Sequence, residues 1–336
     1  MFFLFCDNKE VKGYMFIKRY IKTKINEKVD QMYIKKADQY GIFDLNYLTH
    51  DYNRVWTQEY HLANGFYGIS TILKEYAKIE QSKIIKVPIE HGINDYENAL
   101  NPFEIGFPID KIITLSEFRK KTIERLSNKK AIVIGPYIAY AEGYYEEEKI
   151  KDMHKQNGRT LLVFPTHSTK VIDTNYDVEN FLKEIRKIRK QFDYVLVCLY
   201  WKDIVRGMHK SYQKEGYRVV CAGHIYDIYF LKRLRSIFEM SDAVVLNQTG
   251  TGLGYAIQLQ KPCYIYNQDL NFHSKTSSTA YLEQKYSAEH FEIVKAFSKA
   301  DFFITEEQQK LCRYMYGVGD IKTSQQLQEV LLPCIK

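Results

Sequence analysis

The residues best suited to chemistry in this sequence stand just after short apolar segments. They are histidines, hydroxyl side chains, carboxylates and an amide, which together can bind an anion and move a proton. In the second half of the chain they are His167, Ser168, Thr169, His224, Asp227, Asn247, Thr249 and Thr251. Random placement would scatter such residues over both ends of the segments, whereas here they gather at one. We therefore expect them to converge on one edge of a sheet.

The segment Thr249-Gly250-Thr251-Gly252 has the composition of a phosphate-binding turn. It follows the apolar segment Ala243–Leu246 and precedes an expected helix, which Lys261-Pro262 ends. Glycines let the backbone approach an anion closely, and the free N–H groups at a helix N-terminus then face it. No Gly-Lys-Ser/Thr follows, so the segment is not a Walker A loop. A tight strand-to-helix turn without a ligand is the alternative.

A second candidate group lies in the first half, in Glu90-His91-Gly92-Ile93-Asn94-Asp95. An attacking hydroxyl needs a base to take its proton, and a histidine or a carboxylate beside a cleft can do this. We predict His91 as the base, with Asp95 and Glu90 as substitutes or as groups that orient it. Structural roles for all three stay open as the alternative. Gly135, which closes another apolar segment, is expected to face the same cleft.

Short apolar segments alternate with helical segments, which is typical of a parallel sheet covered by helices on both faces. In the second half we expect strands at 160–164, 194–199, 217–221, 243–246 and 263–266, and helices at 178–190, 203–215, 228–239 and 252–259. In the first half we expect strands at 83–90, 111–115 and 131–134, helices at 63–79 and 117–126, and Ser116 as an N-cap. Further helices and a short strand at 302–304 should follow. The pattern predicts an α/β protein whose second half is a doubly wound, Rossmann-like domain.

Length and composition exclude several classes of protein. The 336 residues fit two domains, and 45% hydrophobic with 26% charged residues argues against disorder. The net charge of +7 suits a nucleotide diphosphate, an anionic glycan or an anionic membrane surface, and no nucleic-acid-binding motif is present. No DxD, HExxH or Cys/His cluster has metal-ligand spacing, so we expect no metal. The 28 Tyr against 2 Trp reflect coding bias or a surface that stacks on sugar rings or bases.

The sequence also predicts where the protein acts. The six cysteines form no CxxC pair, which is typical of a reducing, cytoplasmic setting. No apolar segment approaches the ~20 residues of a membrane span, and the first residues lack the pattern of a signal peptide. Residues 15–28 mix apolar and basic residues, which fits an ordinary surface helix or a peripheral helix on the inner membrane surface. The charged segment 144–158 suggests a domain boundary near residue 150.

Four blocks of the sequence resemble bacterial GT-B glycosyltransferases of capsule and lipopolysaccharide biosynthesis. They are Phe164-Pro-Thr-His-Ser168, Cys198-Leu-Tyr-Trp-Lys-Asp203, Ala222-Gly-His-Ile-Tyr-Asp227 and Asn247-Gln-Thr-Gly-Thr-Gly-Leu-Gly-Tyr255. The resemblance covers about residues 85–145 and 158–268. It implies two Rossmann-like domains facing a cleft: an acceptor-binding domain at 1–150 and a donor-binding domain at 151–310. A helix within 311–336 would cross back to the first domain.

The same resemblance implies an activity and a set of donor-binding residues. The activity is metal-independent transfer of a sugar from a CMP-linked or UDP-linked donor to a growing surface glycan or a lipid-linked acceptor, with no cofactor. The donor-binding residues are His167, Ser168, Thr169, His224, Asp227, Asn247, Thr249, Gly250, Thr251, Gly252 and Gly135. Leu253, Gly254 and Tyr255 stand where these enzymes usually carry an acidic residue, so the way the donor sugar is held is not implied.

Three other functions stay open. His91-Gly92 at the end of an expected strand also resembles the CDP-glycerol polymerases of teichoic acid synthesis, which implies transfer of a polyol phosphate from a CDP-alcohol. A UDP-sugar 2-epimerase on the same fold would need a glutamate pair after the phosphate loop, and this chain lacks it. A non-catalytic scaffold that kept the fold is the third alternative, and such a scaffold should not bind a nucleotide tightly.

Overall fold

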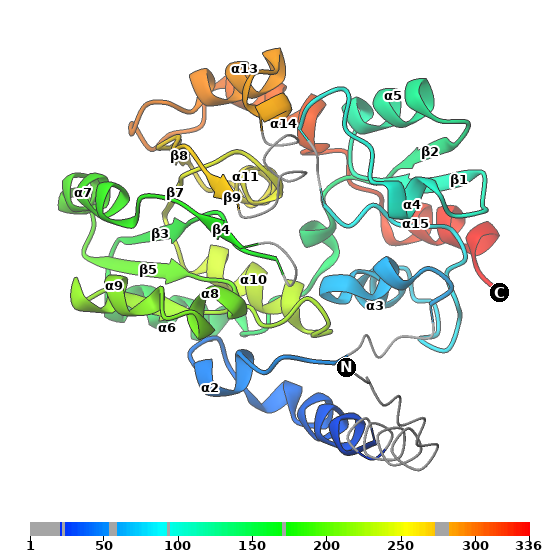
Figure 1. The fold of residues 1–336 in the computed structure, drawn as a ribbon, viewed down its shortest axis with the longest axis horizontal. Helices are drawn as coiled ribbons and strands as arrows, with labels where there is room; N and C mark the ends of the chain where they lie inside the picture. The colour runs from blue at the N-terminus through cyan, green and yellow to red at the C-terminus, as the bar shows by residue number, and fades with distance from the viewer. Residues whose placement is uncertain (1–20, 22–23, 54–58, 93–94, 170–172, 273–281) are drawn as a thin grey trace, which may run out of the picture.

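The fold is centred on a five-stranded parallel sheet. The computed structural model describes residues 21, 24–53, 59–92, 95–169, 173–272 and 282–336 (Figure 1). The strands are β3 (Thr160–Phe164), β5 (Tyr194–Cys198), β6 (Arg218–Val220), β7 (Ala243–Leu246) and β8 (Cys263–Ile265). Their order is β6-β5-β3-β7-β8, and all neighbours pair in parallel. The chain starts in the middle, moves outward to one side and returns to the other, as in a Rossmann fold, so the switch point lies between β3 and β7.

The strands are almost wholly apolar because both faces of the sheet are covered. One face carries Leu162, Leu196 and Val244, which pack with α10 (Phe230–Glu239) and α11 (Thr251–Gln258). The opposite face carries the alternate positions, such as Leu161, Val197 and Val245. Those side chains pack with α7 (Val178–Ile188) and α9 (His209–Lys214). The predicted Rossmann-like character of the second half is therefore confirmed.

Two expectations for the second half are wrong. The single helix expected at 203–215 is two helices, α8 (Trp201–Val205) and α9, because Gly207 adopts a φ of +88° between them. The short strand expected at 302–304 is absent, and Phe302 there has a φ of +52°. The structure adds a pair that we did not expect, β4 (Thr174–Asn175) antiparallel to β9 (Asn271–Phe272).

The first half holds a smaller parallel sheet. It consists of β1 (Lys111–Thr114) and β2 (Lys130–Val133), and α5 (Glu117–Leu126) connects them. Ser116 caps α5 as predicted, since its Oγ accepts from the N–H of Arg119 at 3.2 Å. The described part of this half shows two regular strands, fewer than a second Rossmann-like domain would have.

Two elements of the first half differ from prediction. The segment 83–90 is not a regular strand: it makes isolated bridges at Ile85 and Ile89, and Pro88 between them has no N–H to donate. The expected helix 63–79 is a 3₁₀ segment, η2 (Leu62–Gly68), followed by α3 (Ile69–Tyr76). The break comes where Tyr67 and Gly68 have φ values of +56° and +74°.

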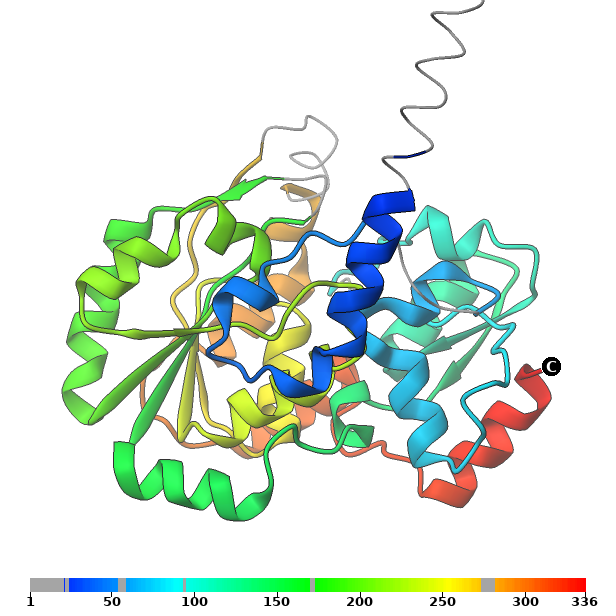
Figure 2. The ribbon, with the colours of Figure 1, turned by 90° about the horizontal axis from the view of Figure 1, so that it is seen from below.

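Residues 306–316 pack against both halves of the chain, and residues 324–336 lie against the first half. They form α14 (Glu306–Tyr316), α15 (Ser324–Leu331) and η5 (Leu332–Cys334). Figure 2 shows α15 beside α3, where Ser324 Oγ donates to Tyr76 O at 2.7 Å and Gln328 Nε2 donates to Ala77 O at 3.0 Å. Beyond α15, the N–H of Lys86 donates to Cys334 O at 2.8 Å. One hydrophobic cluster accordingly contains α3, α15 and sheet residues of the second half.

The remaining elements are short. They are η1 (Ala37–Gln39), α2 (Leu45–Leu48), α4 (Pro102–Ile105), η3 (Tyr137–Tyr140), α6 (Glu147–Asn157), η4 (Arg189–Gln191) and α13 (Ala288–Ala296). Residues 24–35 are also helical, whereas residues 15–20, 22 and 23 of the predicted membrane-contact segment, and Cys6, lie outside the described residues. Within the described part of the chain, no helix has both the length and the apolarity to cross a bilayer. The five described cysteines are buried and unpaired.

Candidate functional site

A cavity of about 310 Å³ lies beyond the carboxyl ends of β3, β5 and β7, at the switch point of the sheet. Both halves of the chain line it. The polar and aromatic lining residues include Tyr67, His91, Thr166, His167, Tyr200, Gln248, Thr249, Thr251 and Tyr255, with Gly92, Gly250 and Gly252. The cavity thus brings together His167 and the segment 249–252, which were expected at one sheet edge, and His91, which was expected beside the cleft.

His91 is oriented by Glu104. The Nδ1 of His91 lies 2.5 Å from Glu104 Oε1, and the same oxygen accepts from the backbone N–H of His91 at 3.1 Å. Because a carboxylate oxygen can only accept here, Nδ1 carries the proton and Nε2 is left to act on a ligand. The ring edge of Phe66, 5.1 Å away between centroids, packs against the imidazole. Sequence reasoning missed Glu104, because nothing in its neighbourhood marks it as a partner of His91.

The two carboxylates predicted as substitutes for His91 are engaged elsewhere. Glu90 is buried and accepts from Arg119 Nε at 2.9 Å and Nη2 at 2.7 Å, with Thr114 Oγ1 on its other oxygen. Burial raises the pKa of Glu90, and Arg119 opposes that shift. Asp95 is buried as well and accepts from Tyr316 OH at 3.3 Å. Neither residue lines the cavity, which favours structural roles for both.

The segment 249–252 forms the turn from β7 into α11. Gly250 has a φ of +142°, which side-chain-bearing residues rarely adopt, and α11 begins at Thr251. A Cβ on Gly252 would lie 2.6 Å from Phe164 Cε1, so glycine is needed there for close packing. The dipole of α11 favours an anion at this N-terminal end. The geometry therefore suits a phosphate in the cavity.

A polar network that the sequence did not reveal supports this turn. Thr249 Oγ1 lies 3.2 Å from His290 Nδ1 and accepts from Gln284 Nε2 at 3.4 Å. Gln284 also donates to Asp95, which links the first half to the turn. His290 is buried, and burial lowers its pKa below 6.5, with the Lys285 charge acting in the same direction.

The segment after β3 divides into an exposed and a buried part. His167 is exposed, lines the cavity and donates from Nδ1 to Ser168 O at 2.8 Å. Ser168 is buried and holds Asp203 and Arg206 instead of facing the cavity. Thr169 is exposed and does not line the cavity. Asn247, also buried, accepts from the N–H of Thr166 at 2.6 Å and so fixes this segment against β7.

Three further predicted residues lie away from the cavity. His224 is buried against the Trp201 ring at 4.6 Å, and its Nδ1 accepts from the N–H of Tyr226. Asp227 forms a buried ion pair with Arg233 at 2.7 Å, and burial raises its pKa. Gly135 packs against the later part of the chain, where a Cβ would lie 2.8 Å from Asp320 O. Within the described ranges, no group of three or more His, Cys, Asp or Glu side chains could hold a metal ion.

Comparison of this chain with known proteins finds a distant structural likeness and no match in sequence. No protein-family model and no curated protein matches it. One similar solved structure is that of the wall teichoic acid polymerase TagF, with a TM-score of 0.38 and 11% identity over 68% of this chain. The match covers 58% of that structure, so this chain spans less than two thirds of its length.

Proposed function

We propose that this chain is a transferase that moves a group from a nucleotide-activated donor to a hydroxyl of a glycan acceptor. The observation that carries the proposal is that the His91–Glu104 pair and the N-terminus of α11 share one cavity. A base and an anion site within one cavity are what such a transfer needs. The proposal assigns the acceptor to residues 1–150 and the donor to 151–310, with 311–336 crossing back.

His91 would act as the general base. Its Nε2 takes the proton of the acceptor hydroxyl while Glu104 holds Nδ1–H and stabilises the imidazolium that forms. A positioned base of this kind contributes roughly 10²–10⁴-fold in rate. The negative charge that develops on the leaving phosphate would be stabilised by the N–H groups of α11 and by the hydroxyls of Thr249 and Thr251.

The transferred group is most simply a sugar, whose bond from the anomeric carbon to the donor phosphate oxygen breaks as the acceptor oxygen attacks that carbon. The acceptor would be a surface glycan such as a capsule or lipopolysaccharide chain. A second candidate is transfer of a polyol phosphate from a CDP-alcohol, in which a P–O bond breaks and CMP leaves. The presence of both His91 and His167 in the cavity favours it, because a second histidine can donate a proton to the leaving phosphate.

A thermal-shift screen of CMP, CDP, UDP and GDP tests the proposal. We expect one nucleotide to raise the Tm of the wild type, by the equivalent of about 2.7 kcal/mol at a concentration of 100 times Kd. The Thr249→Val/Thr251→Val double variant should lose that shift. Thr169→Val, which changes an exposed hydroxyl outside the cavity, should keep it. No shift with any nucleotide in folded protein would contradict a nucleotide-dependent reaction.

The two candidate reactions differ in the product. After incubation with the stabilising nucleotide's sugar or alcohol conjugate, a sugar transferase leaves an acceptor that has gained no phosphorus. A polyol phosphotransferase leaves an acceptor that has gained one phosphate, which phosphorus NMR detects. His91→Gln should slow the formation of either product roughly 10²–10⁴-fold while leaving the thermal shift in place.

A further inference from the structure

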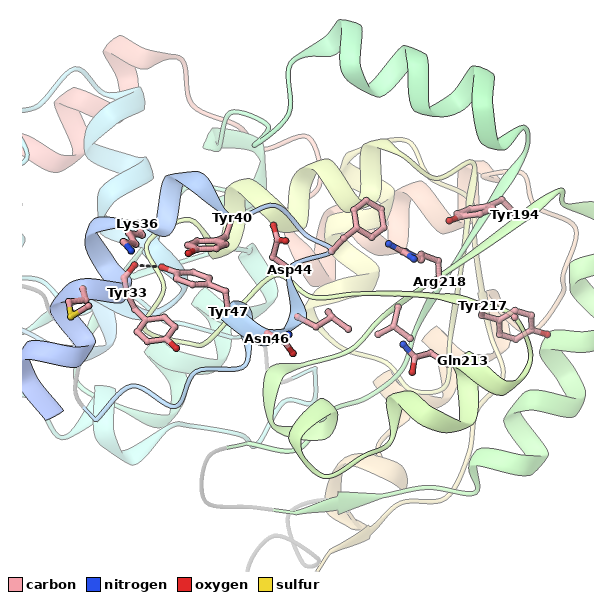
Figure 3. Close-up of a pocket in the computed structure, with 15 residues that line it drawn as sticks. Tyr33, Lys36, Tyr40, Asp44, Asn46, Tyr47, Tyr194, Gln213, Tyr217 and Arg218 are labelled. Carbon is pink, nitrogen blue, oxygen red and sulfur yellow. Dashed lines mark hydrogen bonds between the residues drawn. The ribbon is translucent and has the colours of Figure 1, made fainter.

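A second, larger hollow lies at the end of the five-stranded sheet opposite to the cavity. It is an open groove of about 980 Å³ between residues 32–47 and the starts of two strands (Figure 3). Tyr194 begins β5 and Arg218 begins β6, so the groove is at the amino ends of these strands. The proposed transfer chemistry makes no use of this groove.

Aromatic and amide side chains dominate its walls. Tyr40 stacks on Tyr47 at 3.7 Å between ring centroids, and Tyr47 stacks on Tyr33 at 4.9 Å. Figure 3 shows these three rings on one side of the groove and Tyr194 and Gln213 on the other. Tyrosine rings offer flat apolar faces with a polar edge, and amides offer both donors and acceptors. Sugar rings present the complementary pattern of flat C–H faces rimmed by hydroxyls.

The groove also carries net positive charge, since two cationic side chains, Lys36 and Arg218, line it with a single carboxylate, Asp44. Lys36 and Arg218 are exposed on opposite walls, and neither makes an ion pair with any residue that the structure describes. The Arg218 guanidinium lies over the Phe43 ring at 5.0 Å, which holds it in place. The acidic lining residue Asp44 accepts from the N–H of Gly41 at 2.7 Å. An anionic ligand therefore complements the groove better than a neutral one.

A continuous series of ring contacts joins the groove to the cavity. From Tyr33 the contacting pairs are Tyr33–His50, His50–Tyr52, Tyr52–His224, His224–Tyr226, Tyr226–Phe66 and Phe66–His91. Each step is between 3.8 and 5.8 Å from centroid to centroid. Because Tyr52 and His224 are buried, the series is a packed support that keeps the groove at a set distance from His91.

From these observations we propose that the groove binds a segment of an acidic polysaccharide, remote from the end that reacts at His91. The partly exposed rings of Tyr33, Tyr40 and Tyr194 would contact sugar rings, while Tyr47 is buried and supports the first two. Lys36 and Arg218 would pair with carboxylate or phosphate groups of the polymer. The inference rests on the proposed function only in taking this polymer to be the acceptor. Binding in the groove needs neither a donor nor an intact His91.

Native affinity electrophoresis tests this binding with polygalacturonate as the acidic probe and dextran as the neutral one. We expect polygalacturonate, but not dextran, to retard the wild type. The Lys36→Glu/Arg218→Glu double variant should bind polygalacturonate about tenfold more weakly, as expected for losing two exposed ion pairs. Lys111→Glu/Lys130→Glu is the matched control, since these exposed lysines begin β1 and β2 and carry the same charge change. Mobilities are normalised to gels without polysaccharide.

A second variant controls for misfolding of the double variant, in which the contact between Arg218 and Phe43 is lost. Tyr40→Ser should weaken retardation while keeping the charge and the wild-type circular dichroism spectrum. Equal retardation of the groove and control variants, or equal retardation by dextran, would overturn the proposal. So would a concentration-dependent dimer in ultracentrifugation that Arg218→Glu abolishes, because the groove would then hold a second copy of the chain.

Polysaccharide binding and transfer can be measured separately, so the two proposals can be tested independently. His91→Gln should retain polygalacturonate binding even when transfer is slowed. If the wild type binds the polymer through the groove but no donor yields product, the polysaccharide-binding proposal is supported and the transferase proposal is contradicted. If transfer proceeds and the groove variants bind and elongate a long acceptor as the wild type does, only the polysaccharide-binding proposal is contradicted.

Discussion

At the scale of single residues, the pairing of His91 with Glu104 makes a sharp prediction. Glu104→Gln removes the charge behind Nδ1 but keeps an acceptor there, so the rate constant of transfer should fall while nucleotide binding stays. His91→Ala should lose roughly 10²–10⁴-fold in kcat. Glu117→Gln, which changes an exposed carboxylate of α5, is the control. Full kcat in His91→Ala would remove this histidine from the mechanism.

His290 predicts a pH dependence of stability. Burial holds its pKa below 6.5 in the folded protein, although Asp95 opposes the shift. As the pH falls below about 6.5, the unfolded chain binds this proton first, so the free energy of unfolding decreases. His290→Gln should flatten that decrease in urea titrations run between pH 7 and pH 5. An unaltered slope in His290→Gln would contradict the assignment.

The sequence predicted part of the candidate site and missed the residues that support it. His91, His167 and the segment 249–252 were predictable, because a cleft histidine and a Thr-Gly turn before a helix carry their chemistry in local patterns. Glu104 and His290 were not, since each acts through a contact made only when distant segments fold together. His224 and Asp227 share the local pattern of site residues, yet packing buries them away from the cavity.

At the scale of elements, α11 and α14 meet through a glycine. A Cβ on Gly254 would lie 2.6 Å from Tyr316 Cβ, which is close to the backbone and cannot swing away. Gly254→Ala should therefore force the two helices apart and destabilise the protein by about 1–3 kcal/mol, measured by urea unfolding. Gly92→Ala, where an added methyl meets nothing within 4 Å, should stay within about 0.5 kcal/mol. Equal stability of the two variants would refute the clash.

The elements of the main sheet were predictable to within about a residue, because continuous apolar segments bounded by turns leave little choice. The first half was harder for a physical reason. Ile85 pairs with Ile335 and Ile89 pairs with Ile113, so the segment 83–90 takes its shape from partners far away in the sequence. The break between α8 and α9 at Gly207 was missed for a different reason, since a single glycine inside a helical pattern does not by itself predict a break.

At the scale of the whole molecule, stability should depend on the packing of α15. Leu331 is fully buried within the cluster that joins the two halves, whereas its neighbour Leu332 is 51% exposed. Leu331→Ala should cost roughly 2–5 kcal/mol of unfolding free energy, and Leu332→Ala much less. Chemical denaturation followed by circular dichroism measures both. A similarly small decrease in the free energy of unfolding for both variants would show that the packing of α15 contributes little to stability.

The contacts of residues 324–336 with α3 and with the segment 84–86 bear on the order of events during synthesis. A ribosome makes α3 more than 240 residues before it makes its partner Gln328, as the separation of 251 residues between Gln328 and Ala77 shows. Until then, the apolar side chains of α3 that α15 covers have no permanent neighbour. The second half, whose sheet lies wholly within residues 160–265, can close earlier. We therefore expect the nascent chain to fold from its middle outward, with the packing of the first half completed only after residues 324–336 have been made.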